Sequence, residues 1–145
     1  MRPSLAFAFG LVLAGTAALA HTGVKDPDVM ARMNGMKAMA EHTKTLGLMA
    51  RGTNPFDAAK AQAAIDNLRA ETARIPVLFA PEADDPKSEA LPTIWSDAAG
   101  FAKATEAMDA MLGAADVSSP EAISLTLRDM AKACSVCHES YREKN

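Results

Sequence analysis

Apolar residues recur at three- and four-residue steps in four stretches of the chain, which is the spacing of one face of an α-helix. The four stretches are residues 26–51, 54–79, 93–113 and 118–141. No stretch alternates strictly between apolar and polar residues, as a half-buried strand would. The pattern predicts an all-α protein with four helices.

Polar residues followed by proline indicate where these helices begin. Asp26–Pro27 offers an N-cap followed by proline at the first helical position. Asn54–Pro55 repeats this signal for the second helix, and the third helix is expected to begin near Thr93. The fourth begins either with a capping box at Ser118 or with the cap and proline of Ser119–Pro120.

Helix-breaking residues indicate where the helices end. Gly52 follows the first helix as a suitable stop signal. Pro76 lies inside the second stretch and is expected to kink or end that helix. Residues 80–92, APEADDPKSEALP, are rich in proline and acidic residues, which predicts a loop exposed to solvent.

Four helices of about 20 to 25 residues with short links are expected to pack as an antiparallel four-helix bundle. The inward faces of these helices are rich in alanine, methionine and threonine. In the first helix this face consists of Val29, Met33, Met36, Ala40 and Thr43. Such small residues either let helices pack closely or leave a space that another group fills.

Residues 1–20 are predicted to be a signal peptide, which leaves residues 21–145 as the mature domain. Arg2 precedes a short apolar run, and Ala18-Leu19-Ala20 matches the pattern that signal peptidase cuts after. The run is too short to span a bilayer, so we expect no stable membrane insertion. An N-terminal anchor is the alternative that we favour less. Export would place the domain in the periplasm.

The composition of the chain excludes some classes of partner and activity. Its 145 residues suffice for one domain with a core. The chain has 15 Lys and Arg against 18 Asp and Glu, a formal net charge of −3, and no run of basic residues. Nucleic acid is therefore not an expected partner. No nucleophile–base pair or carboxylate pair stands out, so we do not expect an enzyme.

The last residues contain the motif with the clearest chemistry. Cys134, Cys137 and His138 form the sequence C-x-x-C-H, which attaches c-type haem. Helical residues three apart share a face, so both thiols could reach the two vinyl groups on one edge of the macrocycle. His138 would then offer a nitrogen to the iron as the proximal ligand. We predict one covalently bound haem c, which would also fill space between the small side chains.

Three other interpretations of the two cysteines fit less well. A disulfide would close a very small loop and stabilise little, so it would more plausibly be redox-active than structural. Zinc needs four ligands, and only His21 and His42 remain, at no matching spacing. A thioredoxin-like pair lies at a helix N-terminus after a strand, whereas this pair lies near a helix C-terminus.

Three stretches of the chain resemble the class II cytochromes c, the family that includes cytochrome c′. They are RMNGMK in the first helix, ALPTIWSDAAGF leading into the third, and CSVCHESYR in the fourth. The match spans the mature domain, and the C-terminal position of C-x-x-C-H, followed by Tyr-Arg, distinguishes this class. The resemblance implies a four-helix bundle with haem bound near the C-terminal helix.

The resemblance also implies roles for residues of the first helix. It suggests that Arg32 lies near a haem propionate and that Met36 faces the open side of the iron. Family members often have glutamine where this chain has Met33, which we expect to contact the haem without a polar side chain. Arg142, at the end of the fourth helix, is expected to reach a propionate.

Two functions remain open at this point. If Met36 ligates the iron opposite His138, the protein is a single-electron carrier that exchanges electrons with redox partner proteins in the periplasm. The sequence favours this hypothesis, because Met36-Lys37 resembles the low-spin, methionine-ligated members. If the sixth position is open, the protein is a high-spin cytochrome c′ that binds nitric oxide or carbon monoxide. We expect a monomer or a homodimer.

Overall fold

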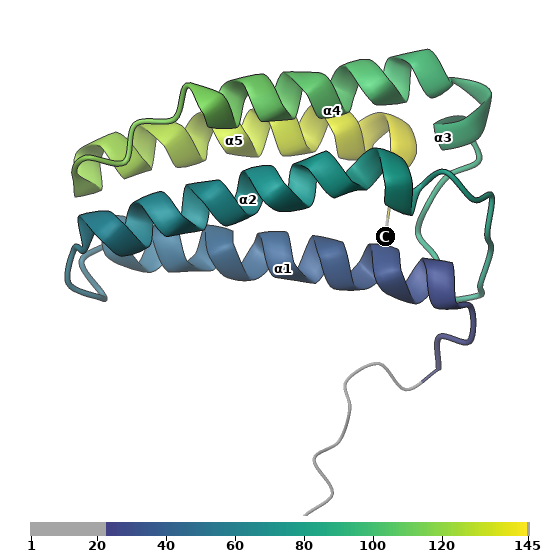
Figure 1. The fold of residues 1–145 in the computed structure, drawn as a ribbon, viewed down its shortest axis with the longest axis horizontal. Coiled ribbons are helices and arrows are strands. Elements are labelled where there is room, and N and C mark those ends of the chain that lie inside the picture. The colour runs from purple at the N-terminus through teal and green to yellow at the C-terminus, as the bar shows by residue number, and fades with distance from the viewer. Residues whose placement is uncertain (1–22, 145) are drawn as a thin grey trace, which may run out of the picture.

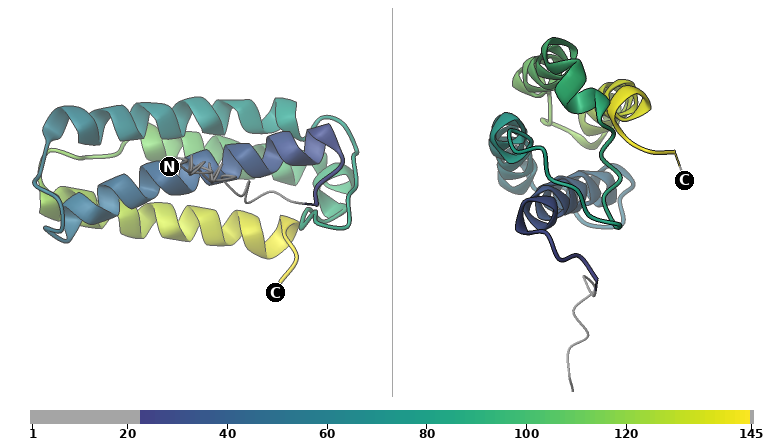
Figure 2. Two further views of the ribbon diagram at one scale, coloured as in Figure 1. Left: turned by 90° about the horizontal axis from the view of Figure 1, so that it is seen from below. Right: turned by 90° about the vertical axis from the view of Figure 1, so that its right-hand side faces the viewer.

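The structure is a computed structural model that describes residues 23–144, so the predicted signal peptide lies outside the described residues. It contains the helices α1 (Pro27–Ala50), α2 (Ala58–Leu78), α3 (Thr93–Ser96), α4 (Ala98–Gly113) and α5 (Pro120–Tyr141). The four long helices lie side by side in alternating directions (Figures 1 and 2). The predicted antiparallel four-helix bundle is confirmed.

Each long helix packs against two others, in the cyclic order α1, α2, α4, α5. Toward one end of the bundle, buried Leu46, Leu68, Leu112 and Ile123 belong to one apolar cluster. The other end, near α3, has a second cluster. Its buried members are Ile75, Ile94, Phe101 and Tyr141. Cys134 packs against the first cluster and Cys137 against the second, so α5 presents its two thiols where the clusters meet.

The predicted starts of the first and last helices are confirmed. The Asp26 carboxylate accepts the N–H groups of Asp28 and Val29, and Pro27 opens α1. For α5, the structure selects the second alternative, in which the Ser119 side chain caps the N–H of Ala122. Both caps satisfy backbone donors that have no partner within the helix.

The predicted start of the second helix at Asn54–Pro55 is wrong by three residues. The Asp57 carboxylate accepts the N–H of Lys60 at 3.0 Å, so α2 begins at Ala58 instead. At the other end, α2 continues through Pro76 and stops at Leu78, two residues later. Pro76 therefore lies within the last turn rather than at a kink in the middle of the helix.

The predicted third helix is interrupted at Asp97, which separates α3 from α4. Asp97 leaves the helical conformation, with φ −121° and ψ 53°, and its carboxylate caps the N–H of Gly100 at 3.1 Å. The same carboxylate accepts the hydroxyl of Tyr141 at 2.8 Å. A long-range hydrogen bond to α5 thus stabilises a break that helical periodicity did not reveal.

The connection between α2 and α3, residues 79–92, is fixed to α1 on one side and to the end of α5 on the other. Asp85, 5% exposed, accepts the N–H groups of Lys25 and Asp26 at 2.7 and 3.2 Å. At the other end, the N–H of Leu91 donates to Tyr141 O, and an isolated bridge joins Ala90 to the end of α5. The predicted loop is therefore held in place by hydrogen bonds.

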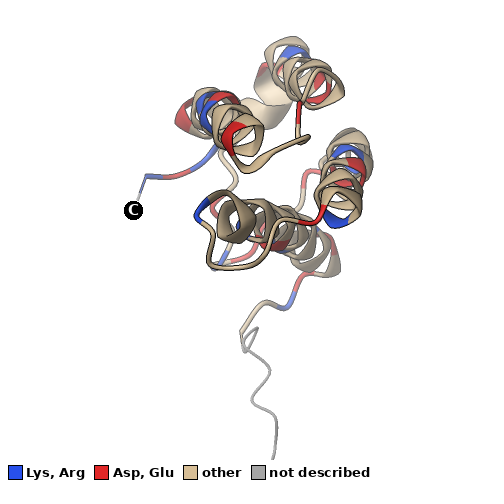
Figure 3. Cartoon of the chain, turned by 90° about the vertical axis from the view of Figure 1, so that its left-hand side faces the viewer, with Lys and Arg blue, Asp and Glu red and all other residues tan. Residues whose placement is uncertain are grey.

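Basic and acidic residues both occur on all four long helices (Figure 3). Within the described part of the chain, no helix combines the length and apolar character that crossing a bilayer requires.

We predict that Asp85→Asn lowers stability at neutral pH and that this effect fades in acid. Hydrogen bonds from the backbone N–H groups of Lys25 and Lys87 hold the pKa of Asp85 below its ordinary value. A depressed folded-state pKa contributes stability above the unfolded pKa, and that contribution is lost as the pH falls through the folded pKa. Urea unfolding at pH 7 and at about pH 2 to 3 measures the difference.

Asp129→Asn is the matched control for this prediction. Asp129 is exposed and pairs only with nearby Lys132, so its replacement should change the urea midpoint little at either pH. A destabilisation by Asp85→Asn that stayed the same at both pH values would contradict the role assigned to the Asp85 carboxylate.

Candidate functional site

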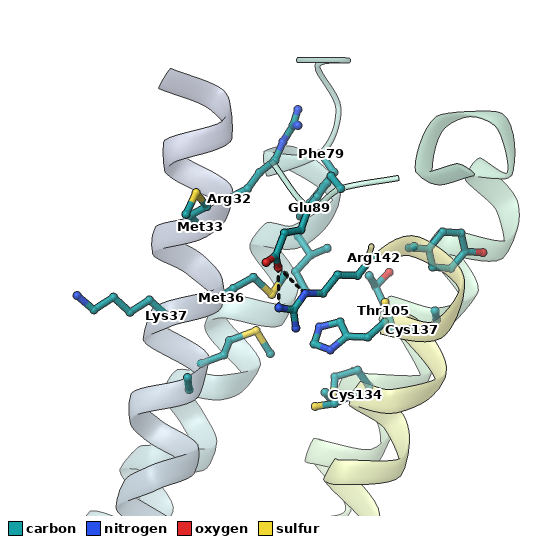
Figure 4. A pocket seen from close by; sticks show the side chains of 18 of the residues that line it. Arg32, Met33, Met36, Lys37, Phe79, Glu89, Thr105, Cys134, Cys137 and Arg142 are labelled. Atoms are coloured by element: carbon teal, nitrogen blue, oxygen red, sulfur yellow. Dashed lines mark hydrogen bonds and ion pairs between the residues drawn. The ribbon is translucent and has the colours of Figure 1, made fainter. Parts of the chain in front are cut away.

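A cavity of about 740 Å³ opens between α1 and α5. Its walls come from all four long helices and from residues 79–92, and most of the lining is apolar. This volume lies within the range of about 300 to 1,000 Å³ that is typical of cofactor and ligand sites. The inward face predicted for the first helix lines this cavity (Figure 4). That face comprises Val29, Met33, Met36, Ala40 and Thr43.

Cys134 and Cys137 both line the cavity from α5 (Figure 4). They lie three residues apart on the helix, so they share its inward face. Both are free cysteines, and burial raises the pKa of each thiol above its ordinary value. The helix therefore presents two protonated thiols side by side at an apolar wall.

His138 follows the two cysteines and also lines the cavity, although the residue is exposed. Partial burial lowers the pKa of its imidazole, and the positive charge of Arg142 lowers it further. Both effects favour the neutral imidazole, which is the form that binds metals. The three residues of the C-x-x-C-H motif thus meet at one cavity.

Arg142 lies one turn beyond His138 and forms an ion pair with Glu89 (Figure 4). Its Nε donates to Glu89 Oε2 at 2.7 Å, and its Nη2 lies 2.6 Å from the same oxygen. The backbone holds this pair together, because the N–H of Glu143 donates to Glu89 O at 2.8 Å. Arg142, expected from the sequence to reach a haem carboxylate, thus already has a carboxylate partner from the protein.

Arg32 lines the cavity from α1 but is only 3% exposed. Its guanidinium donates to the carbonyls of Leu78 at 2.9 Å and Ala83 at 3.0 Å, and also to that of Pro81. It lies over the rings of Phe79 and Trp95, 5.0 and 5.3 Å from their centroids. Its hydrogen-bond partners within the protein are thus three backbone carbonyls.

A guanidinium has five N–H donors. The three hydrogen bonds to carbonyls use three of them, so two N–H groups remain for another acceptor. Burial lowers the pKa of Arg32, and the nearby carboxylates of Asp28 and Asp26 oppose that shift. A guanidinium is not deprotonated in proteins, so a charged group joins α1 to residues 79–92 here.

Three methionines of α1 line the cavity: Met33, Met36 and Met39. Met36 packs against the cluster of Ile75 and Tyr141, and it points from α1 toward the side of α5 (Figure 4). Met39 packs against both apolar clusters. Met36 and the two thiols therefore reach the cavity from opposite walls, with two further thioethers close by in sequence.

Two of the hydroxyl groups that line the cavity donate within their own helices. Thr43 donates to Met39 O at 2.8 Å, and Thr105 donates to Ala102 O at 2.7 Å. Neither therefore offers its proton to a ligand in the cavity, whose walls here are apolar in character. Residues 23–144 contain no group of three or more His, Cys, Asp or Glu placed to hold a metal ion by themselves.

A four-helix bundle with C-x-x-C-H on its last helix, facing a cofactor-sized apolar cavity, is the architecture of a haem-binding bundle of the c type. Comparison with known proteins agrees with this class. The family model for cytochrome c′ matches residues 28–142, so the chain belongs to the cytochrome c′ family. The predicted family is confirmed, and its members are haem proteins that carry haem c covalently and are not enzymes.

Named relatives fall into more than one group of this family. Cytochrome c-554 of Cereibacter sphaeroides is 36% identical over 155 residues and covers 100% of both chains. Other relatives are named cytochrome c′ and cytochrome c-556.

Solved structures also match the fold. A structure of oxidised Rhodopseudomonas palustris cytochrome c556 aligns with a TM-score of 0.75, covering 83% of this chain and 99% of that chain, at 24% identity. A nitric oxide complex of a variant cytochrome c prime from Alcaligenes xylosoxidans aligns with a TM-score of 0.70. It is 29% identical and covers 81% of this chain and 94% of that chain.

Sequence reasoning missed the contributions of residues 79–92. Lys87, Ser88, Glu89 and Ala90 all line the cavity, although their composition indicated only a solvent loop. The pairing of Glu89 with Arg142 joins residues 53 apart, which no local pattern reveals. Only the folded structure shows that Glu89 is the single acidic residue among those that line the cavity.

We predict that Arg32→Met destabilises the protein by at least about 2 kcal/mol. The methionine keeps the apolar stem but leaves three carbonyls without their charged donor, and hydrogen bonds to charged groups contribute about 1.5 to 3 kcal/mol each. Urea unfolding of the purified protein measures the change. Arg69→Met is the control, because Arg69 forms only a half-exposed ion pair with Asp109, expected to contribute less than about 1 kcal/mol. Equal losses of unfolding free energy in the two variants would rule out the stabilising role assigned to the carbonyl hydrogen bonds of Arg32.

Proposed function

We propose that this protein is a periplasmic electron carrier with one haem c. In this proposal Cys134 and Cys137 form the thioether attachments, His138 is the proximal iron ligand and Met36 is the distal ligand. The observation that carries it is that Met36 and the C-x-x-C-H residues line one cavity from opposite helices, α1 and α5. Haem bound there would supply one-electron chemistry at its iron.

Each residue contributes something different to that chemistry. The two thiols fix the cofactor to α5 irreversibly, so affinity need not come from the cavity walls alone. A thioether opposite an imidazole raises the reduction potential and suits both oxidation states, because neither has to gain or lose a ligand. The apolar lining excludes water and lowers the local dielectric, which further tunes the potential.

Two arginines and Met33 complete the proposed contacts with the cofactor. Arg32 has two N–H donors beyond its three carbonyl partners, enough for one carboxylate of a haem. Arg142 would share its charge between Glu89 and a second carboxylate. Met33 would add apolar contact from α1. Residues 1–20 would direct export, and the redox partners would be periplasmic proteins met by a monomer or a homodimer.

A second function has its own support. The cavity is apolar near Thr43 and Thr105, whose hydroxyl protons are already engaged, and such a wall suits a small neutral gas. A relative with 29% identity has been solved as a nitric oxide complex. In this alternative, Met36 lines the cavity without ligation, and nitric oxide or carbon monoxide binds at the open position.

Covalent attachment is tested first. The full chain, expressed in a host that matures c-type cytochromes, is expected to give a coloured periplasmic protein whose mass exceeds that of the mature polypeptide by one haem. Cys137→Ala should lose one of the two thioethers, which the absorption spectrum of the denatured protein reports. A colourless wild-type protein with the mass of the bare polypeptide would refute the proposed function.

Ligation is tested by the absorption spectrum of the oxidised protein. A sulfur-to-iron charge-transfer band is expected in the wild type and should disappear in Met36→Ala, with a lower reduction potential. Met33→Ala and Met39→Ala are matched controls, because each removes a thioether that also lines the cavity. A wild-type protein without the band, whose reduced high-spin spectrum shifts at once with carbon monoxide, would support the gas-binding alternative instead.

A further inference from the structure

Basic residues gather around the cavity although the chain as a whole is acidic. Five basic residues line it against a single acidic one, Glu89, whereas the full sequence has 15 basic and 18 acidic residues. Two of the five basic groups are engaged: Arg32 is buried against carbonyls and Arg142 pairs with Glu89. The other three are the exposed residues Lys37, Lys44 and Lys87.

These three residues, the mouth lysines, lie on two elements beside the cavity. Lys37 and Lys44 are seven residues apart on α1, so they share one face over two turns. Lys87 comes from residues 79–92, where its backbone N–H donates to Asp85 at 2.9 Å. No ion pair found within residues 23–144 includes any of the three.

We propose that the mouth lysines form the docking surface for a redox partner protein that presents acidic side chains. This inference rests on the proposed function and names the chemistry of the partner. An acidic partner is repelled by the net negative charge of the chain as a whole and attracted by the lysines at the mouth. The field therefore orients the encounter so that the cavity, and the cofactor proposed to lie in it, faces the partner.

The orientation of Lys37 favours docking over a role inside the cavity. Its side chain extends from α1 away from the cavity, in contrast to the adjacent Met36 (Figure 4). An ammonium on such an exposed stem attracts anions from solvent, whereas pairing with a cofactor carboxylate would require it to turn inward. Arg32 and Arg142, which also line the cavity, are the residues proposed to meet the carboxylates of the cofactor.

The test uses the reduced holoprotein and hexacyanoferrate(III) as an anionic oxidant. In the reaction, the protein loses one electron and hexacyanoferrate(III) gains it to become hexacyanoferrate(II), with no proton transferred. In the triple variant Lys37→Glu, Lys44→Glu, Lys87→Glu, the second-order rate constant at low ionic strength is expected to fall at least about tenfold. Added salt should slow the wild type and should slow the variant much less, or accelerate it.

The matched control reverses the same number of charges elsewhere. Lys60, Lys103 and Arg128 are exposed and do not line the cavity. Their combined replacement by glutamate gives the same net charge, and we expect a decrease of less than about threefold in the rate constant. An equal decrease in both triple variants would assign the effect to net charge and would overturn the proposal, as would an unchanged rate in the mouth variant.

Two further measurements keep docking separate from cofactor binding. Haem content and absorption spectrum should be unchanged in the mouth variant; a loss of haem or a changed spectrum would show that the lysines hold the cofactor and would overturn the proposal. Poly-L-glutamate added to the wild-type holoprotein should shift the NMR signals of residues around 37–44 and 87–90. Shifts that cluster elsewhere would also overturn it. Failure of the proposed function is recognised separately, because the wild type would then contain no covalent haem.

Discussion

The rest of this structure depends on one constraint. The two apolar clusters pack closely, and the side chains between them are small or flexible. Native interiors tolerate few voids, yet a cavity of about 740 Å³ remains between α1 and α5. Ala40, Ala104 and Ala133 are too short to fill it, and Met36 and Met39 are flexible enough to adapt to a neighbour. A flat apolar cofactor attached to the cavity wall accounts for this composition.

The two thiols of the C-x-x-C-H motif depend on that constraint. On a helix, residues three apart always share a face, but a shared face is useful only where it meets a cavity. The packing of α5 against α1 and α4 directs Cys134 and Cys137 to the junction of the two clusters. The same packing brings α1, with its methionines, to the opposite wall. One helix thus carries the proposed attachment and the other the candidate distal ligand.

Residues 79–92 give the cavity a polar edge. They are held to α1 by Arg32 and Asp85, and to the end of α5 by backbone hydrogen bonds and by the pair of Glu89 with Arg142. Because both ends are fixed, this segment presents charged groups at a defined place beside an otherwise apolar volume. A site that must hold a cofactor with both an apolar ring and carboxylates needs that combination.

The amino-acid sequence by itself determined the features that depend on neighbouring residues. Helical periodicity, the caps at Asp26 and Ser119, and the spacing of Cys134, Cys137 and His138 all follow from interactions within a few positions, so the bundle and the motif were predictable. Local signals failed where several competed, as at Asp57, which begins α2 three residues after the predicted start.

Only the tertiary structure decided the interactions between distant residues. The helix break at Asp97 is stabilised by Tyr141, 44 residues away, which donates to its carboxylate. Arg32 binds carbonyls 46 to 51 residues away, and Glu89 reaches Arg142 across 53 residues. Such partners cannot be read from the sequence, because a charged side chain has many possible acceptors. Which one it meets depends on how the apolar faces of the helices pack.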